Sequence, residues 1–302
     1  LEDVHGFPQW EGEVHDALKA HYADLKSVFR AYAAGSLDGA SNEMDMEEFH
    51  DFAIECDLPT KDYSFDAMVI HYQTANQLSG GGDRVLELHE FLAMLVRIAF
   101  YRANPRSGMI NVKRVGDGAE KLGIVDEQMV PLPGCLVTML EKLVLPLARR
   151  DNAAEFKTTT LVKPEVVAVL DTERARLLEW WEVASGGKDA IELDMWCAEL
   201  ENGLLFNDIK VKDNNSAEHR CRYSIPQTKA AFCASCSLPA RGMMNDEIFE
   251  LVARCGVDKY KMVAPMSKAQ AVHGFIRNLL GDADEEQVVL EATGGAPIVA
   301  KP

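Results

Sequence analysis

Basic residues are scarce in this chain of 302 residues. It has 31 lysines and arginines against 48 aspartates and glutamates, which gives a formal net charge of -17. A surface of this sign repels phosphate backbones and anionic lipid headgroups, so the composition argues against nucleic-acid binding and against attachment to a membrane surface. Cations or basic protein partners fit the charge better.

Long apolar runs are also missing. The most apolar stretch, residues 129–148, is interrupted by Glu141, Lys142 and three prolines, so it predicts a core helix and not a membrane span. The chain opens on Leu1 without a basic and then apolar leader, which predicts no signal peptide in these residues and leaves open whether others precede them. With 47% apolar residues, a chain of this length is expected to form two globular domains.

The cysteines lack the dense pattern of small secreted proteins. There are seven, scattered along the chain, which predicts a reducing compartment and a cytoplasmic location. Cys233 and Cys236 form a C-x-x-C, a spacing that elsewhere is redox-active or supplies half of a metal site. Because no second pair accompanies it, buried core thiols are the favoured interpretation.

The common local signatures of catalysis are absent from the sequence. It contains no G-x-S-x-G, no P-loop and no G-x-G-x-x-G in a strand-helix context. The eight histidines are dispersed; His71 and His89 lie near one predicted loop, but without the spacing of a zinc motif, and surface positions are expected for them. We therefore expect a protein that is not an enzyme and has no cofactor, apart from the calcium ion considered below.

Helical periodicity dominates what is present. Apolar residues recur every three or four positions over residues 11–34, and a second helical pattern begins near Met46 after a turn-rich segment. Another helix-loop-helix unit follows, with its first helix at 64–76 and its loop at 77–83. Two adjacent units of this kind make one lobe, which we assign to residues 1–106.

A second lobe follows a segment rich in glycine and proline. That segment, 107–134, predicts the linker between the lobes. The second lobe is assigned to 135–292 and a frayed tail to 293–302, with a polar loop expected at 202–223. The helices predicted in this lobe cover residues 135–149, 164–184, 191–200, 226–236, 245–260 and 268–280.

An internal repeat indicates that the two lobes are related. Residues 90–99 align without gaps with residues 247–256, and the alignment matches a glutamate, an arginine and the apolar spacing. Residues 25–29 align with 177–181 at a similar offset. Any two amphipathic helices share part of this spacing, but the agreement in order predicts a duplicated lobe.

The loops within each helix-loop-helix unit have the hydrophobic frame of EF-hand calcium loops. Such a loop places oxygen ligands at its first, third, fifth, seventh and ninth positions, a glycine at the sixth and a bidentate glutamate at the twelfth. Its apolar eighth residue pairs with the partner loop through a short backbone bridge. The twelfth positions of the four loops hold Glu48, Glu90, Met195 and Glu247, and the eighth positions hold Met44, Leu86, Ile191 and Met243.

The liganding positions of these loops depart from the EF-hand pattern more than their hydrophobic positions do. The first loop starts at Leu37 instead of an aspartate. The third has Lys188 at the fifth position and Met195 at the twelfth, so a divalent cation would meet a positive charge and lose its bidentate carboxylate. The fourth has Arg241 at the sixth position and few carboxylates. Little or no calcium binding is expected from these three loops.

The second loop is the best candidate for a metal site. Asp83, Glu87 and Glu90 put three carboxylates at liganding positions, although Arg84 stands where glycine is usual. We name these three carboxylates as a weak candidate calcium site. The alternative is that they form a solvated acidic start of a helix.

Residues 90–99 and 254–260 resemble the exit helices of divergent calmodulin-superfamily proteins, the EF-hand-like proteins of ciliary and flagellar axonemes. The resemblance covers most of the chain and implies an all-α fold of two EF-hand-like lobes, with short β bridges between paired loops and extra helices. It implies a structural, protein-binding role on the axonemal doublet microtubule, with tubulin and other axonemal proteins as partners.

Two other functions stay open at this point. A calcium-responsive regulator would bind the ion at the second loop and expose an apolar face containing Met94 and Leu95. A redox or zinc protein would use Cys233 and Cys236. An aromatic cluster in the second lobe, for which core packing is favoured over a partner-binding anchor, comprises Trp180, Trp181 and Trp196.

Overall fold

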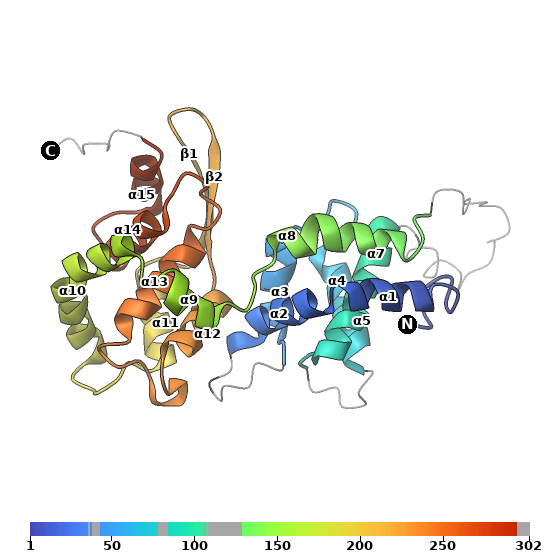
Figure 1. Cartoon of the computed structure of the whole chain (residues 1–302), viewed down its shortest axis with the longest axis horizontal. Helices are drawn as coiled ribbons and strands as arrows, with labels where there is room; N and C mark the ends of the chain where they lie inside the picture. Colours follow the sequence, from blue (N-terminus) through green and yellow to red (C-terminus); the bar gives the residue numbers. More distant parts are fainter. Residues whose placement is uncertain (36, 38–42, 78–83, 106, 108–128, 295–302) are drawn as a thin grey trace. The chain divides into compact units, whose positions relative to one another are not determined.

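The computed structural model describes the chain except for residues 36, 38–42, 78–83, 106, 108–128 and 295–302. The chain divides into two compact units, one made of residues 1–33 and 41–151 and the other of residues 34–40 and 152–302. The described residues are mostly helical, with one two-stranded antiparallel sheet (Figure 1). Each helix in them is too short or too polar to cross a lipid bilayer.

The first unit is helical throughout its described part. Its elements are α1 (Glu11–Ala20), α2 (Tyr22–Tyr32), the 3-10 turn η1 (Ala33–Gly35) at its border, α3 (Met46–Glu55), α4 (Phe65–Asn76), α5 (Leu88–Ala103), α7 (Gly134–Met139), the π-helical turn η5 (Leu140–Val144) and α8 (Leu145–Leu147). The single helix predicted over 11–34 is divided, because His21 leaves the helical conformation (φ -110°, ψ 12°). Apolar periodicity continues across this break, so spacing alone could not reveal it.

Aromatic side chains form the centre of the first core. Phe91 of α5 lies 5.4 Å from Phe29 of α2 and 5.3 Å from Phe52 of α3, measured between ring centroids. Tyr32 meets Phe52 edge to face at 5.3 Å. Such tilted and edge-on pairs are the favoured geometry for buried rings, and they join three helices of the unit at one point.

The segment from α7 to α8 belongs to the first unit. Leu136, Leu140 and Val144 are fully buried in the same core as the aromatic residues. The helix predicted at 135–149 therefore exists but closes the first unit, and the division falls after residue 151 instead of in the predicted linker 107–134. Glycine and proline mark where helices stop, whereas the apolar face of this segment decides which core it joins.

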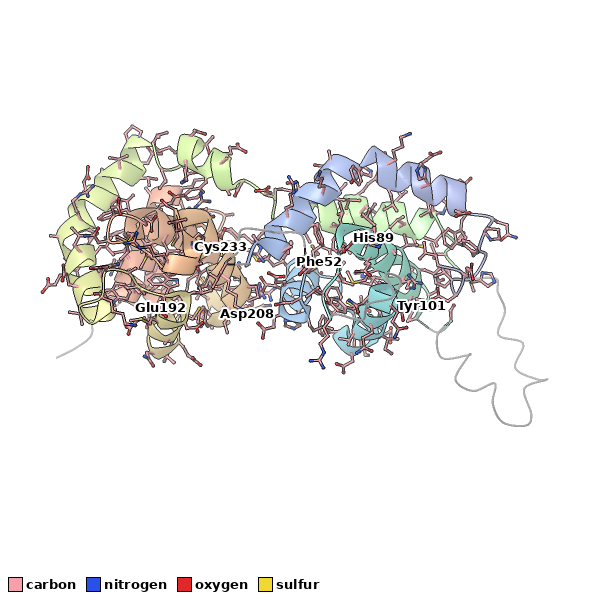
Figure 2. All side chains as sticks on the ribbon, turned by 90° about the horizontal axis from the view of Figure 1, so that it is seen from below. Phe52, His89, Tyr101, Glu192, Asp208 and Cys233 are labelled. Atoms are coloured by element: carbon pink, nitrogen blue, oxygen red, sulfur yellow. The ribbon has the colours of Figure 1, made fainter. Side chains whose placement is uncertain are left out.

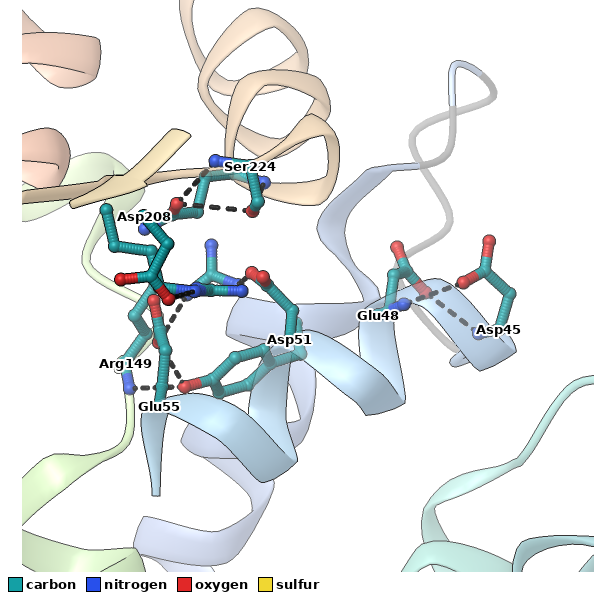
Figure 3. A network of polar contacts seen from close by, with 10 residues as sticks. Asp45, Glu48, Asp51, Glu55, Arg149, Asp208 and Ser224 are labelled. Atoms are coloured by element: carbon teal, nitrogen blue, oxygen red, sulfur yellow. Dashed lines mark hydrogen bonds and ion pairs between the residues drawn. The ribbon is translucent and has the colours of Figure 1, made fainter. Parts of the chain in front are cut away.

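A buried polar cluster fastens the end of this segment to α2 and α3 (Figure 3). The Arg149 guanidinium donates to Asp51 at 2.6 Å and to Glu55 at 3.1 Å, and it lies 4.2 Å from the centroid of the Tyr32 ring. The Tyr32 hydroxyl donates to Glu55 at 2.5 Å, and burial together with that carboxylate raises the pKa of the phenol. Arg150 pairs with Asp24 at 3.2 Å.

The second unit combines helices with a β-hairpin. Its elements are α9 (Ala153–Thr159), α10 (Pro164–Ser185), α11 (Leu193–Asn202), β1 (Asn207–Lys212), β2 (Glu218–Tyr223), α12 (Ile225–Ser235), the 3-10 turn η6 (Pro239–Arg241), α13 (Ile248–Lys259), α14 (Lys268–Leu279) and α15 (Glu285–Ala292). Capping boxes start α12 at Ser224 and α14 at Ser267. Gly186 ends α10 in the left-handed conformation (φ 60°).

The hairpin replaces the polar loop predicted at 202–223. Strand β1 pairs antiparallel with β2, and Asp208, Lys210 and Lys212 lie on one face opposite charged partners. The other face holds the buried Val211 and Cys221. Because one face is wholly charged, the composition of the segment resembles that of a loop. Its polar and apolar residues nevertheless alternate as in a hairpin that is buried on one face.

Helix α14 packs against both α13 and α10. Gly256 of α13 allows the backbones of α13 and α14 to lie close together, because a Cβ at this position would lie 2.6 Å from the backbone oxygen of Ala271. Helix α15 is held by a buried ion pair in which the Lys259 ammonium lies 2.5 Å from Glu285 and also donates to the carbonyl of Leu205 at 2.9 Å. The two helices after α13 are thus integral to the second core.

Candidate functional site

One antiparallel backbone bridge joins the two loops within each unit. In the first unit the Met44 N–H donates to the Leu86 carbonyl at 2.9 Å, and the reverse bond is 2.8 Å. In the second, Ile191 and Met243 exchange bonds of 3.0 and 2.8 Å. All four side chains are completely buried. These are the four residues that the hydrophobic frame predicts at the eighth positions.

The carboxylate of Glu90 is the most unusual group at the first pair of loops. Its Oε2 accepts the N–H of Glu87 at 2.9 Å, which closes a capping box at the start of α5. The residue is only 2% exposed, and among the described residues its Oε1 has no hydrogen-bond partner. A buried carboxylate oxygen without a donor is costly, so this oxygen can accept a further hydrogen bond or bind a cation.

Glu48 occupies the matching place at the first loop. Its Oε2 accepts the N–H of Asp45 at 2.9 Å, and the Asp45 carboxylate accepts the N–H of Glu48 at 2.8 Å (Figure 3). Each of the two loops of the first unit therefore delivers a buried glutamate to the start of its exit helix through the same reciprocal cap.

The predicted calcium ligands are brought together only in part. Asp83 lies outside the described residues. Glu87 and Glu90 share the capping box, but the Glu87 side chain is 59% exposed and lies 3.3 Å from a ring nitrogen of His89. The described portion of the chain contains no group of three or more His, Cys, Asp or Glu side chains arranged to hold a metal.

The exit from the second loop is held by α4. Arg84 has a left-handed backbone (φ 75°) at the position where an EF-hand has glycine. The Tyr72 hydroxyl lies 2.8 Å from the carbonyl oxygens of both Arg84 and Met44 and can donate its single proton to either, and the side-chain amide of Asn76 donates to the carbonyl of Val85. These bonds hold residues 84–86 in place despite an arginine that costs about 1 kcal/mol in the left-handed conformation.

In the third loop a lysine takes the position expected for a cation. The Lys188 ammonium lies 3.3 Å from an oxygen of Glu192 and 3.5 Å from the sulfur of Met195. By the predicted register these two side chains stand at the ninth and twelfth positions. Both partners of this ion pair are exposed, Lys188 by 56% and Glu192 by 64%, so the contact is weak but places a positive charge between two liganding positions.

In the fourth loop a carboxylate binds the loop backbone directly. Glu247 accepts the N–H of Ser237 at 2.6 Å through Oε1 and the N–H of Met244 at 2.9 Å through Oε2. Burial raises the pKa of Glu247, but these backbone donors outweigh burial and lower it below its usual value. The glutamate closes the loop from one end to the other without an ion.

The aligned repeats each bury their arginine. Arg97 and Arg254 are 2% and 5% exposed. Arg97 donates to the Asp3 carboxylate at 2.8 and 3.2 Å, and Arg254 donates to the Ala153 carbonyl at 2.6 Å. The two arginines share their burial but not their partners, because Arg254 takes its carboxylate from Glu250 on its own helix and bonds the first residue of α9, whereas Arg97 binds a residue that precedes α1.

The cysteines and tryptophans behave as core residues. Burial raises the pKa of Cys236, the opposite of what a redox-active thiol requires, and none of the seven cysteines forms a disulfide. Trp196 is fully buried and meets Trp180 edge to face at 5.7 Å. Cys233 lies on α12 of the second unit (Figure 2). Nothing in this geometry favours the redox or zinc interpretation.

The histidines near the second loop have unlike surroundings. His89 is well exposed on the first turn of α5. His71 is half-buried and stacks on Tyr101 at 4.5 Å, contrary to the predicted surface position. Burial, with a smaller contribution from Arg97, lowers the pKa of His71 to about 4. Neither histidine has a metal ligand's environment in the described structure.

Comparison with known proteins identifies no relative. No family model, no curated protein and no solved structure matches the chain. The site must therefore be judged from its own geometry.

Proposed function

We propose that the chain is a structural, protein-binding component built from two EF-hand-like lobes, and that it is not an enzyme. The observation that carries this proposal is the closure of the second unit's loops by the chain's own groups. Lys188 places a positive charge at a liganding position of one loop, and Glu247 binds the backbone of the other. Helix-loop-helix units closed in this way are expected to keep the same angles between their helices at any calcium concentration. A structural protein needs such a fixed geometry.

The covering helices support the same role. In the first unit the segment after α5 packs on that helix and is fastened to α2 through Arg150 and Asp24. In the second unit α14 packs on α13 and α10. A sensor lobe opens by separating its helices and exposing an apolar groove, whereas here α14 joins α10 to α13, and the segment from α7 to Arg150 joins α5 to α2.

The setting we propose is the ciliary or flagellar axoneme, with doublet microtubules and their associated proteins as partners. Its support is the resemblance of residues 90–99 and 254–260 to exit helices of axonemal EF-hand-like proteins. The test is co-sedimentation of the purified chain with microtubules in calcium and in EGTA, together with mass spectrometry of purified axonemes. Equal binding in both buffers is expected; absence from axonemes and from the microtubule pellet would remove this setting.

A second candidate function is favoured by one specific observation. Glu90 and Glu247 are aligned in the repeat, yet Glu247 Oε1 accepts a backbone N–H whereas Glu90 Oε1 has no partner in the described part of the chain. A calcium ion bound to the second loop would satisfy that oxygen, with Glu87 and Asp83 as further ligands. Calorimetric titration of the chain beside Glu90→Gln tests this: micromolar binding lost in the variant supports a calcium-responsive regulator, and silence to millimolar calcium excludes it.

A further inference from the structure

A groove on the first unit lies between α2 and the start of α5. It encloses about 560 Å³, within the size range of ligand and peptide sites. Its apolar lining is made by Phe29, which is buried, by Leu88 and Leu92, which are half-buried, and by Tyr22, which is 46% exposed. His89, labelled in Figure 2, lies beside Leu88 on the first turn of α5.

Charged side chains of opposite sign line the two walls of this groove. Lys26 and Arg30 stand one helical turn apart on α2, where like charges repel. Glu43 and Glu87 come from the two loops. Within the described chain Lys26, Arg30 and Glu43 form no ion pair, although basic residues are the minority in a chain of net charge -17. Lys26, Arg30 and Glu43 are therefore available to a partner, whereas Glu87 lies 3.3 Å from a ring nitrogen of His89.

We infer that this groove binds an amphipathic helix of another protein, with acidic residues along one edge of its apolar stripe and basic residues along the other. The apolar lining would receive the stripe, Lys26 and Arg30 would meet the acidic edge, and Glu43 and Glu87 the basic edge. A simple anion fits less well, because the second wall would repel it. The inference rests on the protein-binding role proposed above and assigns it a surface.

The probe is a synthetic helical peptide of about 18 residues with leucines at i, i+3, i+4 and i+7, glutamates on one edge and arginines on the other. Two control peptides carry glutamates on both edges or arginines on both. Fluorescence anisotropy with the full chain measures Kd. We expect the two-signed peptide to bind at micromolar concentration and each control peptide at least about tenfold more weakly.

The matching protein variant is Lys26→Glu/Arg30→Glu, which turns two attractions into repulsions. It is expected to raise the Kd of the two-signed peptide about tenfold. The control is Lys61→Glu/Lys142→Glu, which removes the same charge from exposed positions outside the groove. Circular dichroism checks that both variants are folded. Binding unchanged by the first pair, or weakened equally by both pairs, would overturn the inference.

A failure of this inference is distinguishable from a failure of the proposed function. If Lys26→Glu/Arg30→Glu loses the peptide and also weakens co-sedimentation with microtubules, the groove is the partner surface. If no peptide binds up to millimolar concentration while co-sedimentation persists, the groove is refuted and the scaffold role stands.

Discussion

Replacing His71 by phenylalanine should remove a specific pH dependence from the stability of the first unit. His71 is half-buried, stacks on Tyr101 at 4.5 Å and lies 6.1 Å from the ring of Tyr63. Burial first, and then the Arg97 guanidinium, lower its pKa from 6.5 to about 4, while Asp3 acts weakly in the opposite sense. Phenylalanine keeps the stacked ring and cannot be protonated.

The sign follows from where the proton binds. Between pH 6.5 and 4 the unfolded chain protonates His71 and the folded chain does not, so protons favour unfolding in this window. The unfolding free energy of the protein with His71 is therefore not reduced by this residue above pH 6.5, and it falls as the pH drops from 6.5 towards 4. A pKa difference of this size corresponds to roughly 3 kcal/mol of unfolding free energy.

The assay is urea unfolding of both proteins between pH 7 and 4.5, followed by far-ultraviolet circular dichroism. The difference in unfolding free energy between them cancels the carboxylates that titrate in the same range, including Asp3, whose pKa Arg97 lowers against the effect of burial. We expect this difference to move in favour of the variant by about 2 kcal/mol or more as the pH falls. The reasoning is refuted if the difference is constant with pH, or if NMR shows His71 titrating near 6.5.

Three further substitutions test other parts of the structure, each by urea unfolding at neutral pH. Arg84→Gly should stabilise the first unit by about 0.5 kcal/mol, since relief of the left-handed strain exceeds the entropy that glycine adds to the unfolded chain; a loss of stability would contradict this. Glu247→Ala should cost roughly 1–3 kcal/mol by removing two charged hydrogen bonds, whereas the control Glu286→Ala, at an exposed position of α15, should leave the stability unchanged. Gly256→Ala should cost about 1–3 kcal/mol, because the added Cβ would lie 2.6 Å from the Ala271 carbonyl oxygen; an unchanged midpoint would show that α14 moves freely.

The sequence predicted the paired loops better than any other feature. Met44, Leu86, Ile191 and Met243 were selected because an apolar residue at that place has to be buried, and burial leaves a strong periodic signal. The structure joins them in two bridges. The helical character of both units was likewise predictable, since their amphipathic stripes are long.

Features that depend on contacts between distant segments could not be predicted in the same way. The bond from the Ser237 N–H to Glu247 joins residues ten positions apart through a backbone group that has no sequence signature. The spacing of Lys188 and Glu192, four positions apart, does carry a signal that would have suggested their contact. The hairpin was missed because its charged face hides the alternation, and α9 and α15 because they are short.

Because the Lys188 ammonium is part of the chain, its presence in the third loop does not depend on the calcium concentration. The occupancy of an ion site follows the free concentration of the ion, so such a site carries information about its surroundings. A cation attached to the same chain has a local concentration set by the length of its side chain, which is identical in a resting cell and during a calcium transient. If this contact persists in solution, the charge at this position of the third loop stays the same at every calcium concentration.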